Sequence, residues 1–425
     1  MFLTEKEHML FPSCTSKKLQ CVVMTAFAVL CVFLLSVQYR ALAGYVQFRI
    51  PTAMPTQTEE QRQALLDVHR FLEQHRGTAN KVDAYLEDMS VAHAAASYER
   101  GINKVGVYLT ADSVANASFY SQTLDRLQQA GASAFVVDVK GSYVYFPTTS
   151  SLAEEMKLVR PLYELPEIVS IAKQKGIYVI ARLIAASDPV FGLRNPDVRI
   201  RHPQTGVAVG SKWVDLGHPT TIEYNKQVIR DIVTAGVDEL NIDYIRYPTE
   251  YAQWQIGLTG QQKADRIEKF VQMARQTIDE YNPSVLLGLS TYAILGWNYP
   301  VNLEPLGQDV IRFAPLVDII SPMAYPSTFA AGAYYNPATH PRSRMYYLVY
   351  QTLKGYAELL GEEHAAKLRP WIQGYYITNK DLRDEIDAVY DAGACGFTVW
   401  SAGNHYDILY KVFPEVNIPE RCLIP

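Results

Sequence analysis

Residues 236–248 read Gly236-Val-Asp-Glu-Leu-Asn-Ile-Asp-Tyr-Ile-Arg-Tyr-Pro248, and this stretch decides the fold. A helical pattern ends at Gly236, and a short strand of alternating apolar residues then brings Asp243 to its C-terminal end. A carboxylate at the end of a parallel strand is typical of the active sites of α/β barrels. The ring of Tyr244 beside it could stack on a sugar. A purely structural alternative is that Asp243 caps the next helix or pairs with Arg246.

Working outward from this stretch, the same alternation of strand and helix continues from Ile102 onward. Eight apolar strands are predicted, at residues 103–110, 134–141, 178–185, 239–247, 285–293, 317–325, 369–376 and 396–402. Amphipathic helices are predicted between them, at 118–130, 166–175, 220–235, 260–281, 343–367 and 379–392, and four of these end at Gly131, Gly176, Gly236 and Gly393. This pattern predicts a (β/α)8 TIM barrel over residues 102–425.

A doubly wound open sheet is the competing architecture. Such a sheet usually carries a glycine-rich phosphate loop directly after its first strand. Here Thr110-Ala-Asp-Ser-Val114 follows the first strand, without a GxGxxG motif. The barrel is therefore favoured.

The first 44 residues predict a membrane segment rather than part of the fold. Lys17 and Lys18 precede an uncharged apolar run at 21–37, which approaches the length needed to span a bilayer. Ala41-Leu-Ala43 also fits a signal-peptidase site, so the segment is either an uncleaved anchor or a cleaved secretory signal. By the positive-inside rule, both alternatives place the barrel outside the cytoplasm, in a periplasmic or extracellular location.

Residues 45–101 are predicted to form a helical spacer between this segment and the barrel. Thr58 with Gln61 fits a capping box at a helix start. Helical periodicity then continues until Gly77, and a second amphipathic piece covers 82–89.

Composition narrows the classes of partner. The net charge of -5 and the pI near 6.0 argue against a nucleic-acid-binding surface. The 29 tyrosines favour a carbohydrate ligand only mildly, because tyrosine also fills interfaces. Outside the N-terminal segment the cysteines are Cys395 and Cys422, which either form a disulfide or remain small buried residues. Neither has a neighbour at metal-ligand spacing, so no metal or cofactor is expected.

The predicted strand ends bring candidate site residues to one face of the barrel. The candidate catalytic carboxylates are Asp243, Asp138 and Asp188. The candidate substrate-binding residues are Arg182, Trp213, Asp215, Arg246, Tyr325, Trp371, Gln373 and Trp400. Carboxylates for acid, base or nucleophile and aromatic rings for the C–H face of a sugar are what a pyranose site requires. Each also has a structural alternative: an ion pair of Asp138 with Lys140, one of Arg182 with Asp243, or tryptophans that fill the barrel.

The chain resembles a glycosyl-hydrolase-like family of mostly bacterial (β/α)8-barrel proteins over about residues 102–413. The most specific blocks are Asp243-Tyr-Ile-Arg-Tyr-Pro248 and Ser321-Pro-Met-Ala-Tyr-Pro-Ser327. Supporting blocks are Tyr178-Val-Ile-Ala-Arg-Leu-Ile184, Asp188-Pro189, Trp213-Val-Asp215, Gly307-Gln-Asp309 and Arg369-Pro-Trp-Ile-Gln373. The resemblance implies a barrel and a polysaccharide or oligosaccharide ligand.

The chain is also weakly similar to chitinase-type barrels, and it departs from them at a catalytic position. Their fourth strand carries Asp-x-x-Asp-x-Asp-x-Glu, and here Asp238, Asn241 and Asp243 fall on the first three acidic positions. Ile245 replaces the terminal acid, and strand seven offers Gln373 where many barrel glycosidases have Glu. A second catalytic acid must therefore come from elsewhere, and the candidates are Asp138, Asp188 and Asp215, with Glu250 and Asp309 behind them.

Two functions remain open from the sequence. The first is a membrane-tethered glycoside hydrolase that acts on a cell-envelope or extracellular polysaccharide, with Asp243 as its main catalytic carboxylate. The alternative is a catalytically inactive barrel that binds carbohydrate or scaffolds the cell envelope, which the missing Glu and Gln373 would explain. Two carboxyls facing an open cleft would favour the enzyme, whereas an Asp243 locked in an ion pair would favour the binding protein.

Overall fold

The structure of the protein, a computed structural model, describes residues 100–365 and 367–423. The chain divides into two compact units, Met1–Ala84 and Tyr85–Pro425, and every described residue belongs to the second. The predicted membrane segment at 1–44 and nearly all of the spacer at 45–101 lie outside the described residues, so both stay predictions. Within the described part of the chain, no helix combines the length and apolar character needed to cross a membrane.

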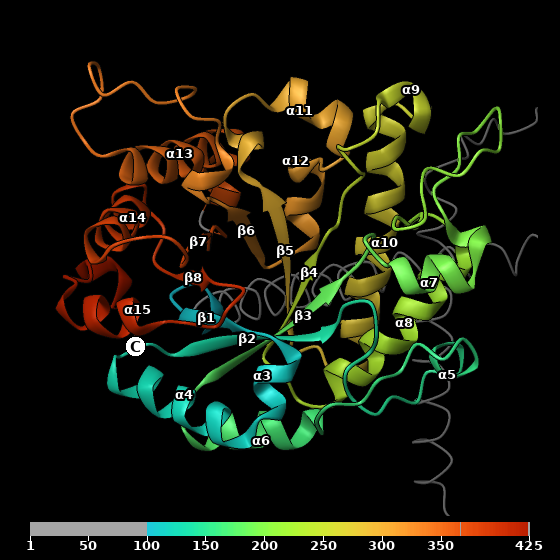
Figure 1. Ribbon diagram of the computed structural model, residues 1–425, viewed down its shortest axis with the longest axis horizontal. Coiled ribbons are helices and arrows are strands. Elements are labelled where there is room, and N and C mark those ends of the chain that lie inside the picture. The colour runs from blue at the N-terminus through green and yellow to red at the C-terminus, as the bar shows by residue number, and fades with distance from the viewer. Residues whose placement is uncertain (1–99, 366, 424–425) are drawn as a thin grey trace, which may run out of the picture. The chain divides into compact units, whose positions relative to one another are not determined.

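Eight parallel strands form a closed barrel, in which each strand pairs with the next and β1 pairs with β8. The strands are β1 (Val105–Leu109), β2 (Ala134–Lys140), β3 (Tyr178–Ile184), β4 (Glu239–Asp243), β5 (Leu286–Tyr292), β6 (Ile319–Met323), β7 (Trp371–Gln373) and β8 (Phe397–Trp400). Figure 1 shows them in the centre of the molecule with the helices around them. The predicted (β/α)8 barrel is confirmed, and each predicted strand is present in a shorter form, most of all β7, which has 3 residues.

The helices of the described residues connect successive strands around the barrel. They are α3 (Ala111–Ala115), α4 (Ala117–Gln129), α5 (Ser151–Glu155), α6 (Leu165–Gln174), α7 (Pro189–Arg194), α8 (Pro219–Thr234), α9 (Gln253–Ile256), α10 (Gly260–Tyr281), α11 (Tyr299–Leu306), α12 (Val310–Phe313), α13 (Arg344–Ala365), α14 (Asn379–Asp391) and α15 (Asp407–Val412). Single 3-10 turns lie at Pro196–Val198, Ala293–Gly296, Ala314–Leu316, Pro326–Thr328, Phe413–Glu415 and Glu420–Cys422.

The helix stops predicted from glycine are also confirmed. Gly131, Gly176, Gly236 and Gly393 all have positive φ, between 68° and 102°. This left-handed conformation directly follows the last turn of a helix and is accessible to glycine without a Cβ clash. Each of these glycines therefore turns the chain from a helix into the next strand.

Side chains alternate between the two faces of each strand, as the pleat requires. On β3, Val179, Ala181 and Leu183 belong to the main apolar core, where the barrel meets its helices. The neighbouring Ile180 belongs to a second, smaller cluster with Trp371 of β7. Since β3 and β7 are not adjacent in the sheet, this smaller cluster fills the inside of the barrel.

Polar groups inside the barrel are paired in successive layers. At the start of the strands, Arg369 donates to Glu239 at 2.6 Å. One step further, the Ser290 hydroxyl donates to Asn241 at 2.7 Å and accepts from the Trp371 indole at 2.9 Å. The last layer, at the C-terminal ends, contains Asp243, and layered filling of this kind is typical of the fold.

A β-bulge interrupts β2 where its last residues pair with β3. Asp138 pairs in register with Arg182, but Lys140 pairs with Leu183, so Val139 is an extra residue. Residues two apart on a regular strand share a face, and a bulge breaks this rule. Asp138 consequently contacts Arg182, whereas Lys140 contacts Asp188. The alternative in which Asp138 pairs with Lys140 is therefore wrong.

Candidate active site

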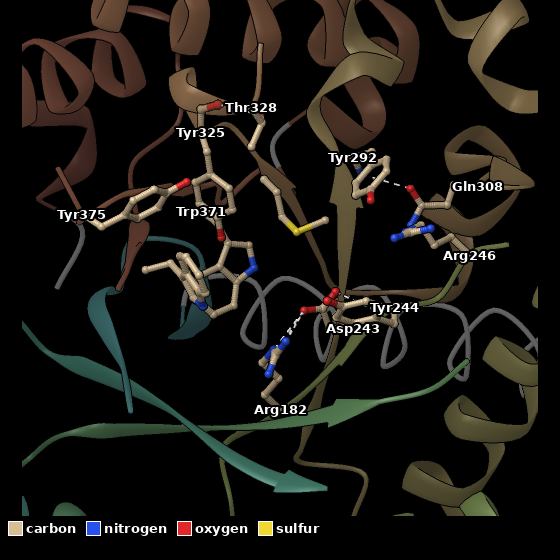
Figure 2. A pocket seen from close by; sticks show the side chains of 12 residues that line it. Arg182, Asp243, Tyr244, Arg246, Tyr292, Gln308, Tyr325, Thr328, Trp371 and Tyr375 are labelled. Carbon is tan, nitrogen blue, oxygen red and sulfur yellow. Dashed lines mark hydrogen bonds and ion pairs between the residues drawn. The ribbon is translucent and has the colours of Figure 1, made fainter. Parts of the chain in front are cut away.

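A pocket of about 230 Å³ opens at the C-terminal ends of the strands (Figure 2). Its walls come from the ends of β3 to β8 and from the segments that follow them. The lining residues are Arg182, Asp243, Tyr244, Arg246, Tyr292, Gln308, Met323, Tyr325, Thr328, Trp371, Tyr375 and Trp400. Asp243 supplies the carboxylate of this lining, and the others are cationic, aromatic, polar or, in the case of Met323, apolar.

Asp243 and Asp138 share one guanidinium. Arg182 donates two hydrogen bonds to Asp243 Oδ2, from Nε at 2.9 Å and from Nη2 at 2.6 Å. Its Nη1 donates to Asp138 Oδ1 at 2.5 Å. Both acids were candidates from the sequence, and the tertiary structure brings them together on either side of Arg182.

The rest of this network fixes each carboxylate. Asp243 Oδ1 accepts the backbone N–H of Tyr244 at 2.6 Å. Tyr244 has φ of 52°, a conformation that is costly for a residue with a Cβ and that clusters at functional sites. On the other side, the Tyr108 hydroxyl donates to Asp138 Oδ2 at 2.5 Å. Burial, together with the negative charge of Asp138, raises the pKa of Tyr108 well above its usual range, so this hydroxyl keeps its proton.

An aromatic wall stands on one side of Asp243. Trp400 packs with Tyr325 and Tyr375 at centroid distances of 5.7 and 5.3 Å, and with Tyr108 at 6.2 Å. Trp371 is almost completely buried, so it forms the floor of the pocket rather than an open face. Burial, and after it the charge of Asp243, raises the pKa of Tyr325 well above its usual range. The wall therefore offers apolar ring faces and neutral hydroxyl groups beside the carboxylate.

Arg246 lies on the opposite side of Asp243 in Figure 2, next to Tyr292 and Gln308. Its guanidinium lies 4.5 Å from the ring centroid of Tyr292 and 4.7 Å from that of Trp213. NH1 donates to the backbone carbonyl of Tyr247 at 2.8 Å. The sequence placed Arg246 beside Asp243, yet among the described residues Asp243 takes its ion pair from Arg182 and not from Arg246.

Asp188 lies outside the pocket, in a fully buried ion pair. Its Oδ2 is 2.8 Å from Lys140 Nζ, and both side chains are at most 1% exposed. Its Oδ1 accepts the backbone N–H of Phe191 and caps α7. Both carboxylate oxygens are thus committed to holding the segment after β3, so Asp188 is left out of the site that we propose.

Trp213 and Asp215 also lie outside the pocket lining. Trp213 is completely buried, and its indole donates to Glu250 at 2.6 Å, so it supports Arg246 from behind instead of facing a sugar. Asp215 forms an ion pair with Arg266 and accepts the backbone N–H of Gly217 at 2.9 Å. Among the described residues, neither is part of the pocket lining.

Gln373 is buried beneath the pocket and has a positioning role. Its Oε1 accepts the backbone N–H of Ser327 at 3.0 Å, and its Nε2 donates to the carbonyl of Tyr375 at 2.9 Å. Since both ends of the amide hold backbone groups, Gln373 connects the segments after β6 and β7. Gln373 is not part of the pocket lining, so the structure does not place it where the predicted substrate contact would be made.

Gln308 and Thr328 line the pocket, although they were not among the residues singled out from the sequence. Gln308 follows α11 and accepts the backbone N–H of Tyr292 at 3.0 Å. The Gly307-Gln-Asp309 block contained the signal for Gln308, but its place next to β5 depends on the path of the intervening helix. No comparable signal marks Thr328. Within residues 100–365 and 367–423, no group of three or more His, Cys, Asp or Glu side chains is arranged to hold a metal ion.

Solved structures that resemble this one share the barrel. The β-galactosidase from the psychrophilic Marinomonas ef1 has a TM-score of 0.54 and 11% identity, covering 73% of this chain and 58% of that chain. The β-galactosidase from Rahnella sp. R3 has a TM-score of 0.51 and 12% identity, covering 74% of this chain and 55% of that chain. The chain thus spans little more than half the length of these two enzymes. At such identities the likeness shows the fold alone.

A hypothetical protein from Ruminiclostridium thermocellum ATCC 27405 is 25% identical, with a TM-score of 0.38, and covers 43% of this chain and 96% of that chain. No curated protein matches the chain. A family model, in contrast, matches residues 106–406, which span the barrel from β1 to the segment after β8. This confirms the resemblance predicted from the sequence motifs. Because the match covers well over half of the chain, the protein belongs to the family described as "Putative glycosyl hydrolase domain".

Proposed function

We propose that the barrel is a glycoside hydrolase that acts on a cell-envelope or extracellular polysaccharide, with Asp243 as its main catalytic carboxylate. The observation that carries the proposal is the position of Asp243 at the end of β4, in a pocket with an aromatic wall. Membership of the family supports the reaction class. Aromatic faces beside a carboxylate suit a sugar ring whose glycosidic bond is to be broken.

Asp243 retains room to react despite its hydrogen bonds. An ionised carboxylate offers about four acceptor positions. Three are used, two on Oδ2 by Arg182 and one on Oδ1 by the backbone of Tyr244. One lone pair of Oδ1 is left for a sugar carbon or a water molecule. A carboxylate that is paired with a cation, as Asp243 is with Arg182, suits a nucleophile or a base better than a proton donor.

Asp138 is not part of the pocket lining, but it contacts Arg182, which is. It is bound to the same guanidinium as Asp243, and its side chain is 14% exposed, against 9% for Asp243. Asp138 is therefore the more exposed of the two carboxylates. We propose that Asp138 exchanges a proton with the substrate, with the Tyr108 hydroxyl as its hydrogen-bond partner.

Asp243→Asn tests the hydrolase directly, because it removes the charge at nearly constant shape. We expect turnover to fall by several orders of magnitude, with glycan binding largely retained, in assays on a panel of polysaccharides. Asp215→Asn is the matched control, since it is the same substitution at an arginine-paired aspartate outside the pocket lining. Near-parental hydrolysis by Asp243→Asn would remove this residue from catalysis.

A carbohydrate-binding barrel without catalysis is the second candidate. It is favoured by one observation: the carboxylate of the pocket lining is held in an ion pair with Arg182. The same polysaccharide panel separates the two functions. Saturable binding of a glycan that the parent protein leaves intact at every pH tested would favour the binding function.

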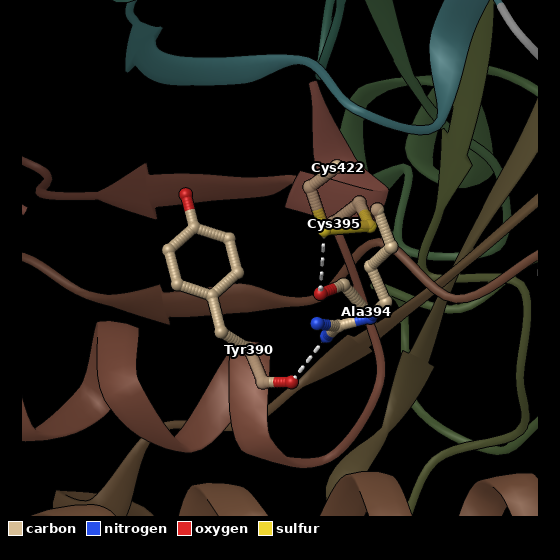
Figure 3. The surroundings of a disulfide bond; sticks show 5 residues. Tyr390, Ala394, Cys395 and Cys422 are labelled. Carbon is tan, nitrogen blue, oxygen red and sulfur yellow. Dashed lines mark hydrogen bonds between the residues drawn. A yellow bond between two sulfur atoms is a disulfide. The ribbon is translucent and has the colours of Figure 1, made fainter. Parts of the chain in front are cut away.

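We propose further that the barrel lies outside the cytoplasm, held at the membrane by the segment at 1–44 or secreted after cleavage. Cys395 and Cys422 form a disulfide across a sequence separation of 27 (Figure 3), which resolves the alternatives left open by the sequence. Structural disulfides persist in oxidising compartments, so this bond supports the proposal. A reporter fused after residue 425 should be active only outside the cytoplasm, and activity confined to the cytoplasm would contradict the assignment.

A further inference from the structure

Arg246 is a buried cation that faces the pocket. It is 7% exposed and lines the cavity together with Tyr292 and Tyr244. Its guanidinium is held between the rings of Tyr292 and Trp213, at 4.5 and 4.7 Å from their centroids. Within the described part of the chain, Arg246 makes one hydrogen bond, which Nη1 donates to the Tyr247 carbonyl. The rings therefore fix the orientation of the guanidinium and leave donor positions for a ligand.

The two arginines of the pocket differ in how their charge is balanced. Arg182 lies within ion-pair distance of both Asp138 and Asp243. Arg246 has no carboxylate within ion-pair distance among residues 100–365 and 367–423. The carboxylate oxygens of Asp243 accept from Arg182 and from the backbone N–H of Tyr244, and Asp243 forms no ion pair with Arg246.

Two other charged side chains, Lys212 and Glu250, lie near Arg246. Lys212 is exposed, and its ammonium lies 5.4 Å from the Trp213 ring and 6.0 Å from the Tyr244 ring. Glu250 is the carboxylate of these two side chains. Partial burial raises the pKa of Glu250, but its hydrogen bonds and the positive charges of Arg246 and Lys212 outweigh burial and lower that pKa. Its carboxylate accepts the indole N–H of Trp213 at 2.6 Å and is exposed to solvent.

A buried cation without an ion pair is costly, and an anion from a ligand reduces that cost. The planar fork of arginine matches a carboxylate in a two-point contact. We propose that Arg246 is a carboxylate-binding subsite, so that the pocket takes an acidic sugar such as a uronic acid, with its carboxylate on Arg246. This inference rests on the proposed function only in taking the ligand to be a glycan.

The test compares acidic glycans with their neutral counterparts. Polygalacturonate, alginate and hyaluronan are each measured next to the same polymer after chemical reduction of its carboxyl groups. Binding is measured with Asp243→Asn protein, so that hydrolysis does not consume the ligand. We expect at least one acidic polymer to bind roughly 10- to 100-fold more tightly than its reduced form, the range for hydrogen bonds to a charged group. The net charge of -5 makes general attraction to polyanions an inadequate explanation of such a preference.

Two variants assign the preference to Arg246. Arg246→Gln, added to Asp243→Asn, should abolish the difference between acidic and reduced polymers. Arg126→Gln is the matched control, because Arg126 also covers a tyrosine ring, that of Tyr410, but is not part of the pocket lining. If Arg246→Gln does not fold, Arg246→Lys keeps the charge without the planar fork and should retain a reduced preference.

Each outcome decides the inference. The inference is overturned if the preference survives in Arg246→Gln, if both forms of each polymer bind equally, or if no acidic polymer binds. It is also overturned if dextran sulfate, a sulfated polyanion, binds more tightly than every carboxylated polymer. Hydrolysis of an acidic glycan at the parental rate by Arg246→Gln would leave the hydrolase in place and remove the acidic subsite. Carboxylate-dependent binding without turnover by the parent protein would support the acidic subsite and contradict the proposed hydrolase.

Discussion

Arg182 has both of the roles that the sequence left open for it. It is a structural partner of Asp243, and it also lines the pocket. Three charged side chains share a site that is closed to most solvent, and each is paired, which limits the cost of their burial. Loss of Arg182 would leave the carboxylates of Asp138 and Asp243 without the cation that they share.

Trp371 and Trp400 line the same pocket, but they should respond differently to truncation. Trp371 is 3% exposed and donates a hydrogen bond to Ser290, so Trp371→Ala should cost about 3–5 kcal/mol of unfolding free energy. Trp400 is only partly buried and presents its ring to the pocket, so Trp400→Ala should mainly weaken glycan binding. Chemical unfolding and affinity electrophoresis measure the two effects.

Trp254→Ala serves as the control for this pair, because Trp254 is 76% exposed and does not line the pocket. It should change neither stability nor binding. A large loss of stability in Trp400→Ala with unchanged affinity would remove Trp400 from the sugar site.

At the scale of elements, α14 packs a carboxyl group against β7. Glu385 is completely buried, and its Oε2 accepts the backbone N–H of Gln373 at 2.8 Å. Its Oε1 has no partner among the described residues. Burial raises the pKa of Glu385 well above its usual range, so the folded protein holds this group as a neutral acid.

Glu385 therefore makes folding sensitive to pH. Since its pKa is raised on folding, its contribution to stability is complete below the pKa of the unfolded chain and is lost as the pH rises towards the folded pKa. Glu385→Gln removes this titration, so its melting temperature relative to the parent should increase from pH 5 to pH 8. The change is at most about 1.4 kcal/mol per pH unit. A difference in melting temperature that stays constant across this range would show that Glu385 does not titrate in it.

At the scale of the whole molecule, the disulfide ties the C-terminal turn to the start of β8. Cys395 precedes β8, and Cys422 is buried in the last 3-10 turn, near the Ala394 carbonyl. A cross-link over 27 residues should stabilise the fold by about 3–4 kcal/mol through the entropy of the unfolded chain. The double variant Cys395→Ala and Cys422→Ala should lose this amount in chemical unfolding.

Reductant should lower the stability of the parent by a similar amount and leave the double variant unchanged. Because the double variant keeps Cys14, Cys21 and Cys31, it also shows whether reductant affects stability through these three cysteines. Equal stability of the parent protein with and without reductant, after complete reduction, would contradict a stabilising role for the bond.

The sequence by itself determined the barrel. Strand and helix are set by local periodicity and by glycine stops, so the eight strands and the four glycine turns were predictable. It also placed Asp243, Arg182 and Asp138 at the same end of the barrel, because the ends of parallel strands converge on one face. These features depend on residues close together in the chain or on the regular geometry of the fold.

Only the tertiary structure decided which of the candidate residues face the pocket. An extra residue in β2 sends Lys140 to Asp188 and leaves Asp138 with Arg182. The segment after α7 folds back so that Trp213 lies beneath Arg246 instead of beside a sugar. A bulge or the return of a long loop is selected by packing and by hydrogen bonds between distant segments, and no local pattern in the chain records that choice.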